Sequence, residues 1–510
     1  MAARALNLYF TSDLHAQIFP VDYASGKKQD IGLFECANRF HKDGNTLVID
    51  GGDLLQGSPL GAFCHDELGN AGVLAEVMNS CGYDYITLGN HDFNYGMPYL
   101  HSYLDALEAR CLCENIIDSS GACAFPHCVH VLENGLRVGL VGLVTDYVNI
   151  WERPEHLAGI SITPPLEAAR RALIALRERC DITVGVYHGG FERDLSTGSI
   201  LSTSTENVAY QICRELDFDI LLTGHQHMSV SGQTLFGTFV VQPSDCGREF
   251  IQIQAEIDGD FKTFSSVAYP ALGACNPEWL HRFSGIEHGA QRWLDQPVGR
   301  LSRAMLPGDP LTMASQGSAL ADFFNQVQLA ASDAQLSATS LANHIAGLPQ
   351  VVRRRDVLTA YPYTNTLTVL AVTGAILRQA MERSASYFSL APDGQLEVSQ
   401  SFLQPKVEHY NYDYYAGVRY EMDISHPVGQ RITRLFYQDC PVCDSDSFTI
   451  CLNSYRASGA GGYECYVGCP VVKEINIEMS DLMLAFFQEH PEVTIEKGCA
   501  YRVVGQGVRC

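Results

Sequence analysis

The sequence is short of positive charge and of long hydrophobic stretches. Its 510 residues hold 34 lysines and arginines against 58 aspartates and glutamates, so the formal net charge is -24. A protein that coats nucleic acid backbones needs a basic surface, so we expect no nucleic acid polymer as a partner. The longest nearly apolar stretch, around 367–377, is much shorter than the roughly 20 residues of a membrane-spanning helix. We therefore expect no membrane partner either.

The first residues also lack the basic segment, apolar segment and cleavage site of a secretory leader. Many of the 18 cysteines stand singly in apolar surroundings, as Cys36 and Cys213 do. Such cysteines are typical of small buried thiols in a reducing compartment. We expect a cytoplasmic protein, with the mature form of a periplasmic or secreted protein as the alternative. For the oligomeric state, which the sequence does not indicate, a monomer is assumed.

Internal repeats and low-complexity tracts are missing as well. The hydrophobic fraction of 46% and the charged fraction of 18% are typical of soluble globular proteins. In the first half, short apolar runs alternate with amphipathic stretches, which favours a layered α/β domain with buried strands. We expect strands at 6–10, 47–50, 85–88, 137–144, 182–187 and 219–223, and helices at 71–80, 99–109, 165–179 and 207–215.

A change of pattern follows residue 270, where a turn-rich stretch leads into helical spacing. The predicted domains are therefore 1–276, a linker helix at 277–297, and a second domain at 298–510. The second domain has an α+β pattern, because helical and alternating segments are not interleaved regularly. Its expected helices are 315–331 and 374–387, and its expected strands are 418–424, 431–437 and 448–453.

Five polar blocks come directly after predicted strands of the first domain, at 11–15, 50–58, 89–92, 188–190 and 224–227. Ligands of α/β sheets collect beyond the carboxyl ends of the strands, where such loops converge. We expect the blocks to bring seven potential metal ligands together: Asp13, His15, Asp53, Asn90, His188, His225 and His227.

The residue types of these blocks suit a pair of metal ions. Imidazole and carboxylate groups bind ions such as Zn, Mn and Fe. Asp13 and His15 are spaced i, i+2, as are His225 and His227, so each pair could project the same way from extended backbone. Seven ligands exceed the need of one tetrahedral ion but suit two ions that share a carboxylate, about 3.5 to 4 Å apart.

The motifs resemble a known family. Asp-x-His at 13–15, Gly-Asp-x-x-x-Gly at 52–57, Gly-Asn-His-Asp at 89–92 and Gly-His-x-His at 224–227 are similar to the signature of calcineurin-like dimetal phosphoesterases. With the second domain, the chain resembles the two-domain 5'-nucleotidase superfamily. The segments 52–60, 89–96, 363–367, 410–413 and 453–457 look most like its 2',3'-cyclic-nucleotide 2'-phosphodiesterase/3'-nucleotidase branch.

This resemblance implies a four-layer α/β/β/α metallophosphoesterase domain, a linker helix and an α+β substrate-binding domain. It assigns Asp13, His15 and His227 to one divalent ion (Zn, Mn, Fe or Co). Asn90, His188 and His225 go to a second ion, and Asp53 bridges both. It also implies in-line attack on phosphorus by a metal-bound hydroxide, with His91 as the catalytic residue that stabilises charge on the phosphoryl oxygens or the leaving group.

Two departures from the 5'-nucleotidase pattern stand out. Where those enzymes have an Asp three residues after the catalytic histidine, this chain has Asn94, which looks normal for the cyclic-phosphodiesterase branch. A neutral amide cannot raise the basicity of an imidazole as a carboxylate would. Where those enzymes grip substrate with a Gly-Gly-Ile-Arg segment, residues 341–347 have no arginine. Both differences favour the cyclic-nucleotide branch.

In this family, two aromatic side chains of the second domain sandwich the base of a nucleotide substrate. Tyr410 and Tyr463 occupy the matching motifs, and Asn453 and Arg456 are further candidates for contacts with the nucleotide. The expected function is thus a 2',3'-cyclic-nucleotide 2'-phosphodiesterase/3'-nucleotidase. A 5'-nucleotidase or UDP-sugar hydrolase is the alternative within the superfamily, and a non-catalytic nucleotide-binding protein on the same scaffold is the remote one.

Overall fold

The computed structural model describes residues 3–202, 204–259, 261–343, 346–363, 365–404, 407–495 and 500–505. His344 and Thr364, which belong to two of the motifs considered above, lie outside these ranges. The chain divides into two compact units, unit 1 at Met1–Trp293 and unit 2 at Leu294–Cys510. Each unit is described by itself. Among the described residues, no helix is both long enough and apolar enough to cross a membrane.

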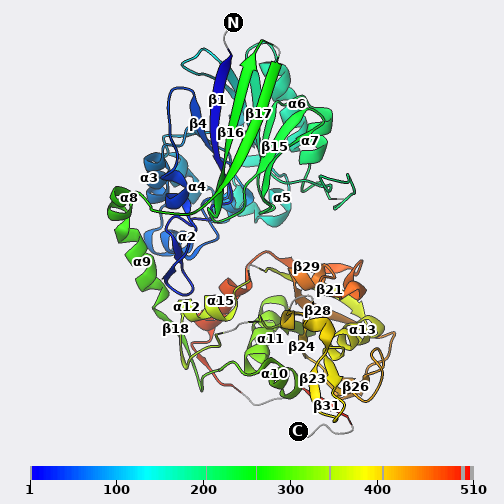
Figure 1. Ribbon diagram of the computed structural model, residues 1–510. Helices are drawn as coiled ribbons and strands as arrows, with labels where there is room; N and C mark the ends of the chain where they lie inside the picture. The colour runs from blue at the N-terminus through cyan, green and yellow to red at the C-terminus, as the bar shows by residue number, and fades with distance from the viewer. Residues whose placement is uncertain are drawn as a thin grey trace. The chain divides into compact units, whose positions relative to one another are not determined.

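Unit 1 is built on two six-stranded sheets (Figure 1). The first has the order β17 (Phe261–Pro270), β16 (Glu249–Asp258), β1 (Arg4–Thr11), β4 (Thr46–Asp50), β5 (Tyr85–Ile86) and β6 (Arg110–Cys111). The second has the order β14 (Val230–Leu235), β15 (Thr238–Gln242), β13 (Ile220–Thr223), β12 (Ile182–His188), β10 (Arg137–Val144) and β9 (Cys128–Val131). Smaller sheets join β11 (Ile160–Ile162), β7 (Cys113–Asp118) and β8 (Cys123–Phe125), and β2 (Val21–Asp22) with β3 (Lys27–Lys28).

The two large sheets pack face to face and carry helices on their outer faces. Leu8 of β1 and Leu140 of β10 belong to one buried cluster between the sheets. The next residue along, Val141, points the other way and packs with residues of α6 (Pro165–Leu176) and α7 (Ala209–Glu215). The remaining helical elements of unit 1 are α1 (Leu33–Ala37), α2 (Pro59–Phe63), η1 (Cys64–Leu68), α3 (Gly72–Cys81), η2 (Asn90–Phe93), α4 (Gly96–Leu104), α5 (Val148–Trp151), η3 (Pro154–Leu157), α8 (Pro277–Arg282) and α9 (Ser284–Leu294), the last reaching one residue into unit 2. The predicted α/β class is confirmed.

Parallel pairing sets the place of the polar loops. β1 pairs in parallel with β4, and β4 with β5. β12 pairs in parallel with β10 and β13. The carboxyl ends of these strands therefore lie at one edge of each sheet, and the loops that follow them start there.

Unit 2 is an α+β domain. Its main sheet has the order β24 (Asp413–Ala416), β19 (Leu336–Ser340), β28 (Ser447–Asn453), β21 (Leu367–Thr373) and β29 (Val471–Ile475). Further sheets join β27 (Cys440–Pro441), β26 (Ile432–Tyr437), β25 (Arg419–Asp423) and β31 (Tyr501–Val504); β20 (Val351–Arg353), β18 (Pro297–Leu301) and β30 (Glu492–Val493); and β22 (Phe388–Leu390) with β23 (Leu396–Val398). The helical elements are α10 (Pro310–Gln316), α11 (Ala319–Ser332), α12 (Arg354–Ala360), α13 (Gly374–Ala385), η4 (Gln400–Phe402), η5 (His409–Asn411), α14 (Ser454–Ala457), η6 (Glu464–Tyr466) and α15 (Met479–Glu489).

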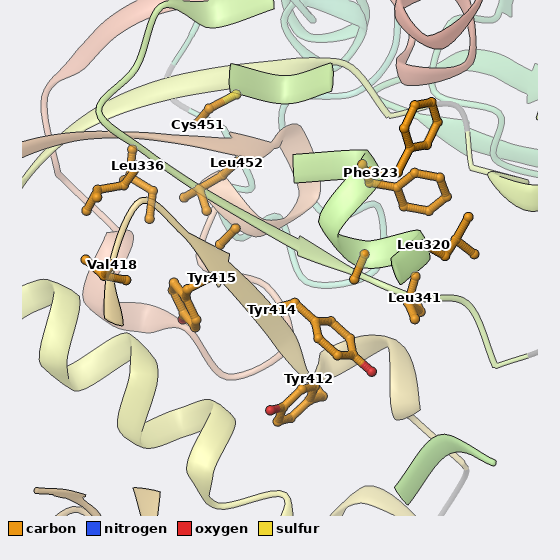
Figure 2. Close-up of a cluster of buried hydrophobic side chains, with 14 of the residues drawn as sticks. Leu320, Phe323, Leu336, Leu341, Tyr412, Tyr414, Tyr415, Val418, Cys451 and Leu452 are labelled. Carbon is orange, nitrogen blue, oxygen red and sulfur yellow. The ribbon is translucent and has the colours of Figure 1, made fainter. Parts of the chain in front are cut away.

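The core of unit 2 forms where α11 covers the main sheet. Figure 2 shows Leu320 and Phe323 of α11 with Leu336 of β19 and the tyrosines of β24. The helix predicted at 315–331 is wrong as one element: it is divided between α10 and α11. Gly317 separates them with φ of 88°, and Ser318 caps α11 by accepting a hydrogen bond from the backbone N–H of Ala321.

The sixteen cysteines among the described residues are all free thiols. Seven of them are buried in the interior: Cys36, Cys64, Cys81, Cys113, Cys213, Cys275 and Cys451. Burial raises the pKa of the Cys64 thiol to about 12, so such groups stay protonated and behave as small hydrophobic residues.

Candidate active site

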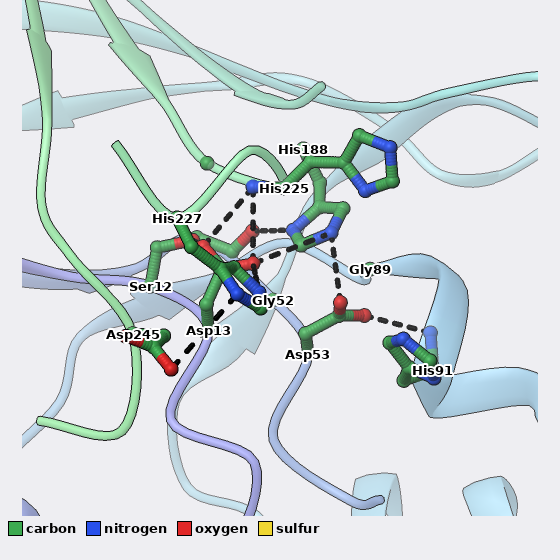
Figure 3. Close-up of polar contacts among 12 residues, drawn as sticks. Ser12, Asp13, Gly52, Asp53, Gly89, His91, His188, His225, His227 and Asp245 are labelled. Atoms are coloured by element: carbon green, nitrogen blue, oxygen red, sulfur yellow. Dashed lines mark hydrogen bonds and ion pairs between the residues drawn. The ribbon is translucent and has the colours of Figure 1, made fainter. Parts of the chain in front are cut away.

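The five polar loops meet beyond the carboxyl ends of β1, β4, β5, β12 and β13 (Figure 3). Backbone hydrogen bonds tie the first two loops together: Asp13 N donates to Gly52 O at 2.9 Å, and His15 N donates to Asp53 O at 2.8 Å. The fifth loop is tied to the first, because His225 N donates to the Asp13 carboxylate at 3.0 and 3.1 Å. The side chains thus stand on a frame of backbone contacts.

The backbone at the site differs from the prediction. Asp13, His15, His225 and His227 do not project from extended backbone; their φ angles are between 49° and 73°. Asp53, at φ 58°, is a fifth potential ligand in this left-handed region. Residues other than glycine rarely adopt such φ angles. Each residue held in this region costs of the order of 1 kcal/mol of conformational energy, which contacts with the surrounding structure must offset. The concentration of strained residues here marks a functional site.

Two glycines allow the second and third loops to touch. A Cβ on Gly52, which has φ of 93°, would lie 2.4 Å from the backbone nitrogen of Gly89. A Cβ on Gly89 would lie 2.2 Å from the Asp53 carboxylate. Neither space can hold a side chain, so glycine is required at both positions.

The Asp92 carboxylate joins the same two loops by hydrogen bonds. It accepts hydrogen bonds from the backbone N–H groups of Asp53, Leu54 and Leu55 at 2.9 to 3.0 Å, and from Gly89 at 2.8 Å. Because Asp92 is buried and saturated by these donors, it is a support of the loops and not a free ligand.

The potential ligand atoms gather in two groups. Asp13, His15 and His227 each offer an atom within 4.8 Å of the others, and so do Asp53, His188 and His225. Inside the first group, Nε2 of His15 and Nε2 of His227 face each other at 3.1 Å. Inside the second group, Nε2 of His188 lies 3.1 Å from Asp53, and between the groups it lies 3.9 Å from Asp13. The groups are therefore adjacent, with the two carboxylates between them.

Unmatched buried atoms show that these residues fit metal ions. Nε2 of His188 and Oδ1 of Asn90 are buried without a well-formed hydrogen bond among the described residues. Buried polar atoms in proteins are normally satisfied, so both atoms point to a ligand. Asn90 lies next to Asp53 along the site, because the following residue, His91, donates its backbone N–H to Asp53 Oδ1 at 2.7 Å; the place of Asn90 in the ligand set stays a prediction.

Electrostatics favour a cation at this place. Burial alone would raise the pKa of Asp13, but His188 and His227 lower it to about 2. Asp53 behaves alike: burial is outweighed by His188 and His91, and its pKa is well below the usual range. Burial would lower the pKa of His188, yet Asp53 and Asp13 raise it to about 10. The two carboxylates are thus ionised, and a metal ion would replace the proton of His188.

The outward-facing nitrogens of three histidines are held by acceptors. Nδ1 of His15 donates to Gln56 O at 2.8 Å, and Nδ1 of His188 donates to Gly51 O at 2.7 Å. His225 differs, because its Nε2 pairs with the Glu206 carboxylate at 2.9 Å. Such outer hydrogen bonds fix the tautomer and leave the other nitrogen for a metal. His225 would therefore bind through Nδ1, and His15 and His188 through Nε2.

His91 lies at the open side of the ligand groups. Its ring centroid is 5.3 Å from that of His15, and its Nδ1 is 2.7 Å from Oδ1 of Asn94. In Figure 3 its side chain stands beside Asp53, apart from the three histidines on the other side. This position fits the predicted role toward a substrate at the ligand groups.

In unit 2, three of the predicted substrate residues lie in the interior, where their polar groups contact other residues of the domain, and their substrate contacts stay a prediction. The guanidinium of Arg456, 1% exposed, forms an ion pair with Asp413 at 2.8 Å and covers the ring of Tyr463 at 4.0 Å. Tyr463 is fully buried, and its hydroxyl donates to Asn411 O at 3.0 Å. Asn453 caps α14 by accepting from Arg456 N. The Gly-rich turn before Tyr463 folds the ring inward.

Tyr410 is half-buried in η5, and a cavity of about 230 Å³ lies beside that turn. The cavity is lined by Tyr387, Tyr412, Tyr414, His409 and Asn343, together with residues of the 307–314 and 341–342 segments. Oδ1 of Asn343 is buried without a hydrogen-bond partner among the described residues, while its amide nitrogen donates to Val407 O at 2.7 Å. The cavity is thus lined by aromatic side chains and by Asn343, whose Oδ1 has no hydrogen-bond partner among the described residues.

Several functional neighbours were missed from the sequence. Glu206 holds His225, and Trp151 stacks on the same imidazole at 5.5 Å. Asp92 was noted only as part of a motif. Neither Glu206 nor Trp151 belongs to a recognisable spacing, because Trp151 reaches the site from the end of α5 and Glu206 from a loop, both far from the strand-end motifs in sequence. Only the Asp at the end of Gly-Asn-His-Asp carried a signal.

Comparisons with known proteins agree with this geometry. Residues 6–229 match the calcineurin-like phosphoesterase family, and residues 297–468 match the 5'-nucleotidase C-terminal domain family. A solved structure from Staphylococcus aureus, presented as a candidate 5'-nucleotidase, is 32% identical with a TM-score of 0.72, and the match covers 98% of this chain and 100% of that one.

Two curated relatives are similar over most of the chain. The 2',3'-cyclic-nucleotide 2'-phosphodiesterase/3'-nucleotidase of Yersinia enterocolitica is 25% identical, over 96% of this chain and 86% of the relative. The trifunctional nucleotide phosphoesterase protein YfkN of Bacillus subtilis is also 25% identical over 96% of this chain, which spans 38% of that protein's length.

The fold and the two ligand groups define a phosphoester hydrolase of the calcineurin-like class, a class that implies divalent metal ions. More narrowly, the chain belongs to the two-domain 5'-nucleotidase family, in which this catalytic domain precedes a 5'-nucleotidase C-terminal domain. The family resemblance predicted from the motifs is confirmed.

Proposed function

We propose that the protein is a two-metal phosphohydrolase that hydrolyses 2',3'-cyclic nucleotides to 3'-nucleotides and then removes the 3'-phosphate. The observation that carries the two-ion part is the pair of adjacent ligand groups with the unmatched atoms of His188 and Asn90. The Yersinia relative supports the substrate class, because its name states this activity and it matches along nearly the whole chain.

The residues divide the work as follows. Asp13, His15 and His227 would hold one ion, Asn90, His188 and His225 the other, and Asp53 would contact both. When bound, the ions would supply Lewis acidity to a water and to the phosphoryl oxygens. Imidazole ligands are neutral and only two carboxylates are present, so the loaded site keeps a positive charge that attracts the phosphate.

His91 serves the leaving side of the reaction. In the first step water attacks phosphorus, the bond from phosphorus to the 2'-oxygen breaks, and that oxygen takes a proton. The backbone of His91 is anchored on Asp53 and its Nδ1 faces Oδ1 of Asn94, so Nε2 is the nitrogen left for the substrate. When both ring nitrogens are protonated, His91 can deliver the Nε2 proton to that oxygen or stabilise the oxyanion. In the second step the same groups act on the 3'-phosphomonoester.

Asn343 supports a preference among bases. Asn343 lines the aromatic cavity of unit 2, and its Oδ1 has no hydrogen-bond partner among the described residues, so this acceptor would be available to the exocyclic amino group of adenine or cytosine. Uracil offers no such donor at that position. We expect Asn343→Ala to raise KM for 2',3'-cyclic AMP at least about tenfold while KM for 2',3'-cyclic UMP changes little. Equal changes for both nucleotides would contradict this base preference.

The decisive experiment is a substrate panel on enzyme reconstituted with Mn²⁺, Zn²⁺ or Co²⁺. Steady-state kcat/KM is measured for 2',3'-cyclic AMP, 3'-AMP, 5'-AMP and UDP-glucose, with apo enzyme in EDTA as the control. The proposal expects the first two substrates to be the best. A higher kcat/KM for 5'-AMP would instead identify a 5'-nucleotidase, and no hydrolysis with any metal would support a non-catalytic nucleotide-binding protein.

A further inference from the structure

The catalytic histidine stands at the head of a chain of hydrogen bonds that reaches a buried carboxylate. Nδ1 of His91 lies 2.7 Å from Oδ1 of Asn94, and Nδ2 of Asn94 donates to Oε2 of Glu152 at 2.7 Å. The Glu152 side chain is only 7% exposed. Asn94 therefore does not end the chain; a carboxylate follows one residue further out.

Both carboxylate oxygens of Glu152 accept hydrogen bonds from neighbouring groups. Its second oxygen, Oε1, accepts from the backbone N–H of Arg153 at 2.8 Å, and Nδ1 of His156 lies 2.8 Å from the same atom. The turn η3, which carries His156, packs against α4, and the His156 ring lies 3.5 Å from where a Cβ on Gly96 would stand, an ordinary contact distance. The carboxylate is thus fixed in place from outside the site.

The chemistry of this chain settles which way the Asn94 amide points. A carboxylate only accepts hydrogen bonds, so the amide nitrogen of Asn94 must face Glu152. The amide oxygen must then face His91, and an oxygen acceptor requires the proton on Nδ1 of the imidazole. The Nε2 side is left toward the substrate. Asn94 alone could present either end of its amide, and only Glu152 removes that choice.

We propose that Glu152 is a positioning residue for catalysis, which fixes the orientation of the Asn94 amide and thereby the Nδ1–H tautomer of His91. In this way the chain replaces the direct carboxylate partner of a catalytic histidine by a carboxylate acting through an amide. This inference rests on the proposed function, because it assigns His91 its catalytic role.

The role of Glu152 is tested with variants that remove its charge or move that charge to position 94. In Glu152→Gln, the backbone N–H of Arg153 keeps the glutamine oxygen on its side, so the new amide nitrogen faces Asn94. Asn94 then turns its oxygen outward and its nitrogen toward His91, which enforces the opposite tautomer. We expect kcat for 2',3'-cyclic AMP to fall by the order of 100-fold with KM little changed, since a wrong tautomer disables an acid–base histidine.

Rescue distinguishes positioning from general damage. In the double variant Asn94→Asp with Glu152→Gln, the aspartate accepts from both His91 Nδ1 and the Gln amide, and kcat should return to within about tenfold of wild type. The single variant Asn94→Asp places two carboxylates against each other and should remain impaired. Glu155→Gln, an exposed change of the same kind three residues away, is the matched control and should behave as wild type.

A spectroscopic measurement separates this inference from the proposed function. Long-range ¹H–¹⁵N spectra of histidine-labelled, Zn²⁺-loaded protein, with His91 assigned by comparison with His91→Ala, show which ring nitrogen carries the proton. Nδ1–H in the wild type and Nε2–H in Glu152→Gln are expected. An Nε2–H wild type, or an unchanged kcat in Glu152→Gln, would overturn the role of Glu152. A wild type with the Nδ1–H tautomer and no hydrolysis of any phosphoester would overturn only the proposed function.

Discussion

The polar cluster at the strand ends of unit 1 and the buried Arg456 cluster of unit 2 look alike in sequence but differ in one respect. In the first, the buried atoms His188 Nε2 and Asn90 Oδ1 have no well-formed hydrogen bond among the described residues. In the second, Arg456 is matched by Asp413, Ala460 O and Tyr410 O, so its donors are used within the domain. Unsatisfied buried atoms indicate a site for something absent, whereas satisfied ones indicate a support of the fold.

Among the tests of this comparison, Asp53→Asn is expected to have the largest effect, on metal affinity and kcat. The change removes one of the two carboxylates between the ligand groups while keeping the size of the side chain. We expect metal affinity to fall by more than the roughly 10- to 100-fold that follows loss of an outer hydrogen bond, and kcat to be almost abolished. Metal content by mass spectrometry and kcat on 2',3'-cyclic AMP check this. Two ions per chain with normal kcat would show that Asp53 is no ligand.

The reverse pattern is expected in unit 2 from Arg456→Ala. The change strands the Asp413 carboxylate in the interior, and breaking a buried ion pair costs about 3 to 5 kcal/mol of the free energy of unfolding. Urea denaturation of unit 2 measures the loss, and KM is measured at a temperature where the variant is folded. Asp413→Asn with Arg456→Met should recover much of the stability. A stable Arg456→Ala variant with a strongly raised KM would return Arg456 to the substrate-binding residues.

Glu206→Gln sharpens the comparison at the edge of the metal site. The hydrogen bond from His225 lowers the pKa of Glu206, which shows the carboxylate in its ionised form beside the imidazole. A neutral amide holds His225 less firmly, so affinity for Zn²⁺ should fall about 10- to 100-fold. Competition with a chromophoric chelator measures this. Glu215→Gln, an exposed change on α7, serves as the control, and equal affinities in both variants would refute the role.

The smallest effect is expected from Asp50→Asn, which separates a structural carboxylate from the ligands of the same loop. Burial raises the pKa of Asp50 to about 8, and its oxygens accept from Thr11 Oγ1 at 2.7 Å and Gly52 N at 3.1 Å. The folded chain keeps this proton between about pH 4 and pH 8 while the unfolded chain loses it, so stability falls as pH rises through that window.

The Asn variant has no such proton to lose. Its stability relative to the wild type should therefore be higher at pH 8 than at pH 4, because only the wild type is destabilised as the pH rises. Urea denaturation of metal-free protein at pH 4, 6 and 8 checks this. A difference independent of pH would mean that Asp50 is ionised in the folded chain.

The strand-end ligands could be predicted because two simple rules act together. Short apolar runs mark the strands, and parallel strands of one sheet end at the same edge, so the polar blocks after β1 and β4, and those after β12 and β13, could be expected to lie side by side. The left-handed backbone of Asp13 could not be predicted, because it follows from contacts with the Gly52 loop.

The residue pairs that support the site and the interior of unit 2 could not be predicted from the sequence, for a related reason. The partnership of Arg456 with Asp413, and that of Asn94 with Glu152, arises when segments more than forty residues apart pack together. No spacing in the sequence records such a pair. An arginine or tyrosine in a family motif therefore looks like a ligand contact until its partner inside the fold is seen.

The touching loops of Gly52 and Gly89 have a consequence for how such enzymes diverge. A side chain at either glycine would collide with the opposite loop. The shape of the site around Asp53 therefore cannot be changed by a single substitution at either glycine. The cavity of unit 2 that Asn343 lines has no such constraint from two touching loops, so we expect single substitutions to change a nucleotide preference more readily there than around Asp53.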